Sequence, residues 1–351
     1  MTATRMTSAN RLGVGIVGLG SIGVTHAQAL AAIAEAGDQP VSLVAYSGGN
    51  PGKAAEAGWP DAEQLSVDAV IKHPGISVIA VAGPSQVHGE LTIAALEAGK
   101  HVLVEKPLTL LVGEAERIRR LAREQGRIVR MVAQRHYETE YAHVKQLIDA
   151  GDLGALRLAA TQVHWWRDDD YYTAAAWRGS MAAGGGSVMN QGVHNIDLLR
   201  WLAGPVARVT AQYATLGHAI DAEDTTVATL SFRSGALGMI SISTATPPGT
   251  PATVTLQFAS GGIELGQGEV IRWDVPAARP AAGEEVRSGA ADPANIGIAG
   301  HVTQWRQLID ALGSDPHEQP DLDDAVATVR LLCAIYAAAE SGRAVNPDEL
   351  S

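Results

Sequence analysis

The sequence is poor in cysteine, in phenylalanine and in basic residues. It holds one cysteine and two phenylalanines, and its 26 lysines and arginines stand against 38 aspartates and glutamates. Cys333 has no partner for an internal disulfide, and its place in a helical pattern predicts a buried, small apolar residue. The net charge of −12 repels phosphate backbones and anionic lipid, so we expect neither nucleic acid nor a membrane surface as a partner.

Long hydrophobic runs are also missing from the sequence. The apolar run at residues 12–19 is short and broken by glycines, so it is neither a secretory core nor a membrane span, and we expect a cytoplasmic protein. The composition, 46% hydrophobic and 18% charged, is typical of a globular protein. A chain of 351 residues is too long for one ordinary core and predicts two domains.

Strands and helices alternate through the first part of the chain. Predicted strands lie at residues 13–17, 41–46, 78–82, 101–105 and 128–133. Helical patterns lie between them, at residues 22–36, 87–98 and 110–125. This alternation predicts a parallel sheet with helices on both faces, so residues 1–134 are interpreted as a doubly wound Rossmann domain that binds a dinucleotide.

After residue 134 the pattern changes to long strands separated by short turns. Predicted strands lie at residues 156–165, 206–216, 225–232, 236–243 and 252–258. Helices are expected at residues 141–150, 187–203, 302–312 and 321–341. Residues 135–351 are therefore interpreted as an α+β domain for substrate binding and oligomerisation, with an open, mostly antiparallel sheet and flanking helices. Its last helices are free to pack back on the first domain.

Gly18, Gly20 and Gly23 lie between a predicted strand and a predicted helix. In a dinucleotide-binding turn, the first glycine permits the tight turn, the second lets the backbone approach the pyrophosphate, and the third lets helix and strand pack closely. The start of the following helix, around Ser21 and Ile22, offers free N–H groups and a partial positive charge to phosphates. The turn therefore predicts the pyrophosphate site of a nicotinamide dinucleotide.

The end of the second strand bears on the choice between NAD and NADP. An acidic residue there binds the adenosine ribose and repels a 2′-phosphate, but residues 46–53 contain neither a carboxylate nor an arginine. Ser47 and Asn50 are able to bond a phosphate, and Lys53 is able to pair with it. Lys53 is equally interpretable as a solvated lysine at a helix start. These residues favour NADP and leave NAD open.

Lys106 follows a predicted strand and precedes Pro107. In an open parallel sheet, ligands bind at the carboxyl ends of the strands, so Lys106 is expected where the nicotinamide and the substrate meet. Pro107 removes a donor and fixes the angle at which the chain leaves the strand. An isolated lysine after a strand is usually a surface residue, but its place in a dinucleotide-binding domain makes Lys106 a catalytic candidate.

A second candidate group lies in the predicted helix at residues 187–203, which three glycines precede. Asn190, His194 and Asp197 have i, i+4 and i+7 spacing, which places them on one helix face. A lone histidine on a helix is more often structural, but His194 stands on a polar stripe beside a glycine-rich entry. We therefore predict that His194 is catalytic.

These motifs together resemble the glucose–fructose oxidoreductase / inositol dehydrogenase / MocA family over essentially the whole chain. The resemblance rests on the glycine turn, residues 83–88, residues 94–102, Glu105-Lys106-Pro107, and the segment from Gly185 to Asp197. It implies that Lys106 and His194 are catalytic, and that homodimers or homotetramers form, often through the open sheet. It also places at the cofactor Gly83, Pro84, Ser85, His88, Glu105 and Lys106.

The chain departs from the family pattern at one position. Many members have an aspartate four residues before the catalytic histidine, where this chain has Asn190. That difference weakens any mechanism that needs a carboxylate partner for His194, because an amide stabilises an imidazolium less well.

The expected substrate cleft collects aromatic and hydrogen-bonding side chains: Gln134, Arg135, His136, His164, Trp165, Trp166, Arg167, Tyr171, Tyr172, Trp177 and Arg178. The residues predicted to bind substrate are Gln134, Arg135, His136, Trp165, Arg167, Trp177, Arg178, Asn190 and Asp197. Asp197 stands at the family's later acidic position, where the resemblance implies a bond to substrate or to His194. Aromatic faces beside many polar groups suit a sugar or a cyclitol. The three arginines also leave a carboxylated or nucleotide-linked sugar open. The aspartates at residues 168–170 are interpreted as a solvated turn, because no histidine or cysteine cluster accompanies them, and no metal is expected.

The predicted activity is reversible hydride transfer between a nicotinamide and a carbinol carbon of a sugar, a cyclitol or a sugar derivative. His194 takes the hydroxyl proton, and Lys106 stabilises the developing alkoxide. Three alternatives stay open. They are cleavage of glycosidic bonds with a tightly held NAD, reduction of non-sugar substrates of the dihydrodiol type, and a non-catalytic protein that senses the cofactor.

Overall fold

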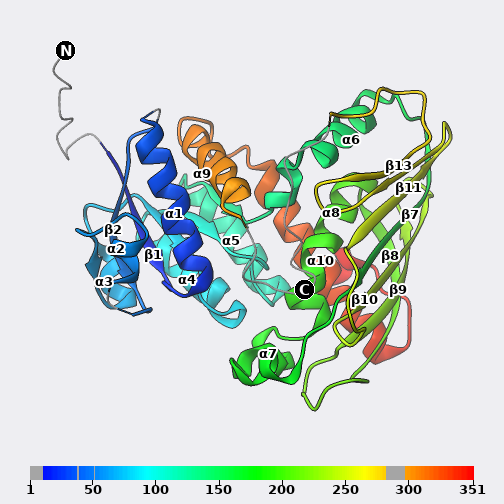
Figure 1. Cartoon of the computed structure of the whole chain (residues 1–351), viewed down its shortest axis with the longest axis horizontal. Coiled ribbons are helices and arrows are strands. Elements are labelled where there is room, and N and C mark those ends of the chain that lie inside the picture. The colour runs from blue at the N-terminus through cyan, green and yellow to red at the C-terminus, as the bar shows by residue number, and fades with distance from the viewer. Residues whose placement is uncertain (1–10, 38, 51, 282–296) are drawn as a thin grey trace.

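Two β-sheets organise the computed structural model, which describes residues 11–37, 39–50, 52–281 and 297–351 (Figure 1). The first sheet has six strands, all parallel, in the order β3-β2-β1-β4-β5-β6. Its strands are β1 (Leu12–Val17), β2 (Val41–Ser47), β3 (Glu63–Gln64), β4 (Val78–Val81), β5 (His101–Val104) and β6 (Val129–Met131).

Helices cover both faces of the first sheet, because its strands are apolar on both sides. The helices are α1 (Ser21–Ala36), α2 (Lys53–Glu56), α3 (Val67–Lys72), α4 (His88–Glu97), α5 (Val112–Glu124), α9 (Ala299–Ala311) and α10 (Pro320–Ser341). Ile16 packs in a core with Trp305 of α9, whereas its neighbour Val17 packs in the opposite core with Val326 of α10. The last two long helices therefore return to the first domain, on opposite faces of its sheet.

The second sheet has seven strands in the order β13-β12-β11-β7-β10-β9-β8, with β7 and β10 parallel and the other neighbours antiparallel. The strands are β7 (Leu156–His164), β8 (Val206–Ala214), β9 (Thr225–Phe232), β10 (Leu237–Ser243), β11 (Thr253–Phe258), β12 (Gly262–Leu265) and β13 (Val270–Trp273). The predicted α/β domain and α+β domain with an open, mostly antiparallel sheet are confirmed.

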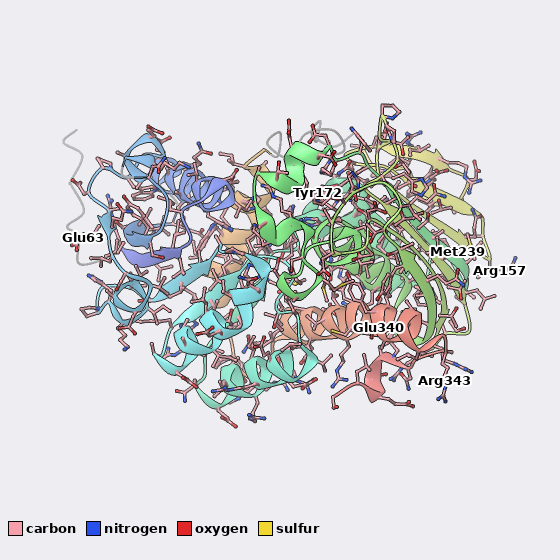
Figure 2. The ribbon with its side chains drawn as sticks, turned by 90° about the horizontal axis from the view of Figure 1, so that it is seen from below. Glu63, Arg157, Tyr172, Met239, Glu340 and Arg343 are labelled. Atoms are coloured by element: carbon pink, nitrogen blue, oxygen red, sulfur yellow. The ribbon has the colours of Figure 1, made fainter. Side chains whose placement is uncertain are left out.

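Helices pack on one face of the second sheet, and the other face exposes apolar side chains. One face forms a core with α6 (Thr139–Ala150), α8 (Val193–Ala203) and α10. The other face exposes large apolar side chains, among them Leu158, Val227, Leu237 and Met239. Figure 2 shows Met239 at the end of the molecule opposite Glu63 of the first sheet.

The order of the first sheet reverses between β1 and β4, where a crevice opens at the carboxyl ends of parallel strands. Gly18 follows β1, Ala82 follows β4, and Glu105 and Lys106 follow β5. The strand order thus brings the glycine turn and the Glu-Lys-Pro motif to the same edge. The second domain reaches this edge through α7 (Asp169–Thr173) and the segment before α8 (Figure 1).

Several elements differ from the sequence-based expectation. The short elements α2, α3, α7, β3, β12 and β13 were not predicted, because most of them span too few residues to show a period. Residues 187–203, predicted as one helix, form a π-helical turn at Ser187–Gly192 followed by α8. Short 3-10 segments lie at Ser85–Val87, Gln134–Tyr137, Ala176–Gly179, Met181–Ala183 and Pro347–Glu349. Among the described residues, none of the helices combines the length and the apolar character that crossing a membrane requires.

Candidate active site

The glycine turn has the geometry that each of its glycines was expected to provide. Gly18 has a φ of +98°, and a Cβ there would lie 2.8 Å from the backbone of Ala82. A Cβ on Gly23 would lie 2.2 Å from the carbonyl oxygen of Gly18, so helix and turn pack without space for a side chain. A Cβ on Gly20 would meet no heavy atom within 4 Å. The backbone at Gly20 is therefore open to a ligand.

The start of α1 is free to bind an anion. Gly20 is its N-cap, no side chain caps it, and its first turn holds no acidic residue. Its first N–H groups and the helix dipole therefore favour a negative charge at this end. These features fit the pyrophosphate of a dinucleotide.

The end of β2 and the glycines after it pack closely on the glycine turn. The carbonyl of Ser47 accepts hydrogen bonds from the N–H groups of Gly18 and Leu19, and Ser47 itself is buried. Gly49 has a φ of +73°, and a Cβ there would lie 2.2 Å from the carbonyl oxygen of Leu19. A Cβ on Gly48 would meet its nearest atom only at 3.8 Å. Beyond these glycines, Asn50 is exposed and Lys53 is partly exposed.

Lys106 joins the two domains at the carboxyl end of β5. Its Nζ donates to the backbone carbonyl of Asn190 at 2.8 Å and to Oδ1 of Asn190 at 3.4 Å. Burial lowers the pKa of Lys106, and the nearby Glu105 carboxylate partly offsets that effect. A lysine held in this way is a donor with a reduced preference for its charged form.

Glu105 is held by side chains from two helices that are distant in the sequence. His26 of α1 donates its Nε2–H to Oε1 of Glu105 at 3.1 Å, and Nε2 of His301 on α9 lies 3.6 Å from the same oxygen. The other oxygen of Glu105 accepts the backbone N–H of Lys106 at 3.2 Å. Burial alone would raise the pKa of Glu105, but the two histidines hold it well below its usual value. The residue before Lys106 is thus an ionised, buried anchor.

His26, Glu105 and His301 lie near enough to one another to hold a metal ion. The indole N–H of Trp305 decides against this role, because it donates to Nδ1 of His26 at 3.1 Å and can only donate. Nδ1 of His26 therefore carries the lone pair and Nε2 carries the proton. A proton on Nε2 leaves no lone pair for a metal on the side that faces Glu105.

His194 is the first side chain after the π-helical turn to reach the cavity. Burial lowers its pKa to about 3, and the positive charges of Lys106 and Arg135 add to that effect. Its imidazole is therefore neutral at pH 7. No side-chain hydrogen bond involves its ring within the part of the chain that the structure describes. His194 is a neutral base with a ring nitrogen available to a ligand.

A cavity of about 370 Å³ joins the glycine turn to Lys106 and His194. Its wall on the first domain consists of Gly20, Ser21, Ile22, Ala82, Gly83, Pro84, Ser85, His88, Glu105 and Lys106. Its wall on the second domain consists of Trp165, Arg167, Tyr171, Trp177, Arg178, Asn190, Gln191 and His194. The two predicted catalytic residues and most predicted cofactor and substrate residues therefore meet in one cavity between the domains.

His88 lines this cavity but is engaged by the protein. Its two ring nitrogens lie 2.7 Å from the carbonyl oxygen of Pro107 and 2.8 Å from that of Gly83. The ring thus ties the turn after β4 to the Glu-Lys-Pro motif. It holds these two walls in place and offers the cofactor little hydrogen-bonding capacity.

Four residues predicted to bind substrate lie outside this cavity. Oδ2 of Asp197 is 2.7 Å from Nε2 of His136, and Oδ1 accepts from Thr328 at 2.6 Å. Burial would raise the pKa of Asp197, but His136 holds it below the usual value. Arg135 is buried and donates to Asn195 at 2.6 Å. Gln134 lies beside them in the same 3-10 segment as Arg135 and His136.

Sequence reasoning missed Gln191, and the reason lies in the helix geometry. A regular α-helix would put Gln191 and Asn190 on different faces, about 100° apart. Residues 187–192 instead form a π-helical turn, and both side chains line the cavity while Asp197 turns away from it. The histidines that hold Glu105 were also missed, because nothing in the spacing of His26, His301 and Trp305 brings them together.

The fold and the site define a class of protein: a Rossmann domain whose crevice is completed by a second domain with an open sheet. The chain belongs to the GFO/IDH/MocA family. Residues 12–133 match the family described as "Oxidoreductase family, NAD-binding Rossmann fold", and residues 141–264 match the "GFO/IDH/MocA C-terminal domain". The resemblance inferred from the motifs is confirmed.

Solved structures and curated sequences include similar proteins. The WlbA dehydrogenase from Bordetella pertussis, solved with NADH and UDP-GlcNAcA, is 30% identical with a TM-score of 0.82, over 96% of this chain and 99% of that chain. Levoglucosan dehydrogenase of Pseudarthrobacter phenanthrenivorans is 34% identical over 58% of this chain and 54% of its own length. The scyllo-inositol 2-dehydrogenase (NADP(+)) IolW of Bacillus subtilis is 31% identical over 44% of this chain and 42% of its own. The chain spans about half the length of these two relatives.

Proposed function

We propose that the protein is an NAD(P)-dependent dehydrogenase that oxidises a carbinol carbon of a sugar, a cyclitol or a sugar derivative. One observation carries this proposal: Lys106 and His194 line the same cavity as the open glycine turn. Membership of an NAD-binding oxidoreductase family supports it. The relatives named for levoglucosan and scyllo-inositol support the substrate class.

The cofactor would be held by the glycine turn and the start of α1, with its nicotinamide end toward Lys106. The nicotinamide supplies the hydride acceptor. Lys106 donates a hydrogen bond to the substrate oxygen and stabilises the negative charge that develops there. His194 takes the hydroxyl proton, and positioned base catalysis of this kind contributes about 10²–10⁴-fold in rate.

The low pKa of His194 is compatible with this role. Burial lowers the pKa of His194 most, and the charge of Lys106 lowers it further. The same charge makes a hydroxyl bound beside Lys106 more acidic. The hydroxyl becomes more acidic still as the hydride leaves, because the carbon then becomes a carbonyl. A weakly basic imidazole is therefore sufficient at the moment of proton transfer.

The test is a panel of sugars, cyclitols and sugar acids with NAD and with NADP, followed by the absorbance of the reduced nicotinamide. We expect net reduction with at least one carbohydrate, and a loss of about 10²-fold or more in kcat/KM for Lys106→Ala and for His194→Ala. Lys72→Ala is the matched control, since Lys72 is exposed on α3 and pairs with Asp68. Glycoside cleavage without net reduction would instead support the enzyme with a tightly held cofactor.

We also propose that two copies of the chain associate through the outer face of the second sheet. A groove of about 570 Å³ lies on this face, between β7–β10 and the end of α10. Leu158, Val227, Leu237 and Met239 expose apolar side chains there or close to it, and such a patch is typical of an interface. Light scattering after size exclusion should give a dimer or a tetramer, and Met239→Arg should shift it toward the monomer.

A further inference from the structure

The ring of Tyr171 lies close to two arginines on the wall of the cavity. The guanidinium carbon of Arg178 lies 4.3 Å from the centre of its ring, and that of Arg167 lies 5.4 Å away. Both arginines and Tyr171 line the cavity beside Asn190 and Gln191. This group of five residues is called the arginine–tyrosine wall below.

The two amides of the wall have their orientation set by cations. Lys106 only donates, so Oδ1 of Asn190 faces Lys106 and Nδ2 faces the opposite way, to the phenol oxygen of Tyr171 at 3.0 Å. Arg167 also only donates, so Oε1 of Gln191 faces Arg167 at 3.5 Å and Nε2 donates to the same phenol oxygen at 2.6 Å. Both lone pairs of the Tyr171 hydroxyl are therefore occupied.

Because two amides donate to the hydroxyl oxygen of Tyr171, the hydroxyl proton has to point away from both of them. A tyrosine hydroxyl has one proton to donate, and the hydroxyl of Tyr171 is bounded by two amide donors. The proton is therefore available to a ligand in the cavity. Tyr171 offers a donor there and has no remaining capacity to accept.

Arg178 adds a charge to this donor. One of its N–H groups donates to the backbone carbonyl of Tyr171 at 2.8 Å, and no carboxylate pairs with its guanidinium within the described ranges of the chain. Glu105, the carboxylate among the described lining residues, is held by His26 and His301. In a protein with a net charge of −12, the second domain thus presents this cavity with donors and positive charge.

We propose that the substrate carries an anionic group, a carboxylate or a phosphate, that binds the guanidinium of Arg178 and the hydroxyl of Tyr171. This inference rests on the proposed function and narrows its substrate class to acidic sugars or cyclitols. A guanidinium beside a hydroxyl donor complements an acceptor-only oxyanion, whereas a neutral polyol would bring no negative charge to pair with the guanidinium of Arg178. The anionic group also fixes which carbon faces Lys106 and His194.

The experiment compares substrates that differ only in the anionic group. The probes are D-glucose, D-glucuronate and D-glucose 6-phosphate, and D-galactose with D-galacturonate, each with NAD and NADP. Turnover gives kcat/KM, and the quenching of tryptophan fluorescence in the cofactor complex gives Kd. The variants are Arg178→Gln, Arg178→Lys and Tyr171→Phe, with Arg120→Gln as the matched control, because Arg120 is an exposed arginine on α5 that pairs with Glu124.

We expect kcat/KM to be higher for an anionic sugar than for the neutral sugar with which it is paired. Arg178→Gln should reduce that preference about 10- to 100-fold, the usual effect of losing a hydrogen bond to a charged group. Arg178→Lys should restore part of it, Tyr171→Phe should weaken it, and Arg120→Gln should leave it unchanged. The carboxylate and phosphate probes distinguish the two anions.

Two outcomes would overturn the inference, and they differ from each other. Oxidation of neutral members as efficiently as anionic ones, with no effect of Arg178→Gln on the ratio, rejects the anion site and leaves the dehydrogenase intact. Absence of turnover and of binding for every probe rejects the proposed carbohydrate function together with this inference.

Discussion

Nε1 of Trp305 lies 3.1 Å from Nδ1 of His26, and this hydrogen bond connects residues 279 positions apart. It sets the tautomer of His26, which in turn donates to Glu105, the residue before Lys106. Helix α9 thereby helps to hold Glu105, the residue before Lys106, for which we propose a catalytic role. We therefore expect this contact to affect both the stability of the first domain and the position of Lys106.

Trp305→Phe should reduce activity through that contact. The substitution keeps an aromatic ring but removes the donor, so the tautomer of His26 is no longer set and Glu105 is held less firmly. We expect a loss of about 1 kcal/mol in the free energy of unfolding. We also expect a loss of up to about tenfold in kcat/KM, which corresponds to about 1.4 kcal/mol.

Trp59→Phe is the matched control for this prediction. The indole of Trp59 donates to the carbonyl of Ala27, the residue next to His26, but makes no contact with Glu105 through it. Denaturant unfolding and steady-state kinetics should show similar losses of stability in both variants and a loss of activity only in Trp305→Phe. Equal activities in the two variants would contradict the positioning role.

The pH profile of kcat/KM should be flat through the normal range of histidine. The pKa of His194 lies at about 3, so its basic form is present from pH 5 upward and no acid limb from His194 is expected near pH 6.5. In the proposed mechanism Lys106 acts as a cation, and burial lowers its pKa, so activity should fall on the alkaline side below pH 10.5. Lys106→Arg should remove that alkaline limb. An acid limb near pH 6.5 that His194→Gln abolishes would show that the pKa of His194 is not lowered in this way.

Asn190→Asp should move the alkaline limb to higher pH. The new carboxylate beside Lys106 favours the ammonium form, so the pKa of Lys106 rises. It also accepts the proton of the Tyr171 hydroxyl, which the asparagine amide cannot accept from its Nδ2 side. The variant should therefore have a higher KM for an anionic substrate, and its activity should persist to higher pH. An unmoved limb would show that Asn190 does not control Lys106.

Gly48→Asp should shift the cofactor preference from NADP toward NAD. A Cβ at Gly48 meets its nearest atom at 3.8 Å, and aspartate tolerates the φ of +72° better than most residues. The added carboxylate binds an adenosine ribose and repels a 2′-phosphate. We expect the ratio of kcat/KM for NAD to that for NADP to rise about tenfold or more, equivalent to about 1.4 kcal/mol.

Gly49→Ala is the contrasting variant for cofactor choice. Its Cβ would lie 2.2 Å from the carbonyl oxygen of Leu19, so the substitution should disturb the glycine turn. It should therefore weaken the binding of NADH and of NADPH to the same extent. Fluorescence titration with NADH and NADPH gives both Kd values. A Gly48→Asp variant with an unchanged ratio would place cofactor choice elsewhere in the cavity.

In acid, the free energy of unfolding of the wild type should fall relative to that of the His101→Gln variant. Burial and the charge of Arg127 lower the pKa of His101 to about 4, from 6.5. Below pH 6.5 the unfolded chain binds a proton at His101, whereas His101 of the folded chain stays neutral. The free energy of unfolding therefore falls as the pH drops from 6.5 to 4. Urea unfolding of both proteins at pH 7, 6, 5 and 4.5 measures the difference, which should change steadily in that direction. A constant difference would reject the shift.

The sequence alone determined the features that depend on local pattern. The strand and helix period of the first domain, the roles of Gly18 and Gly23, and the candidates Lys106 and His194 all follow from short-range spacing. Their reason is local: a turn, a cap or an apolar face needs only residues that are near one another in the chain. The carboxyl end of β5 was also predictable as a ligand edge, because parallel strands end together.

The tertiary structure decided what depends on long-range contact or on a change of helix period. The π-helical turn at Ser187–Gly192 brings Gln191 beside Asn190 and turns Asp197 toward His136, and no periodicity in the sequence reveals it. The return of α9 brings His301 to Glu105 and Trp305 to His26. The proton of Tyr171 is available to a ligand because cations from both domains orient the amides around it, which only the packing of the two domains can arrange.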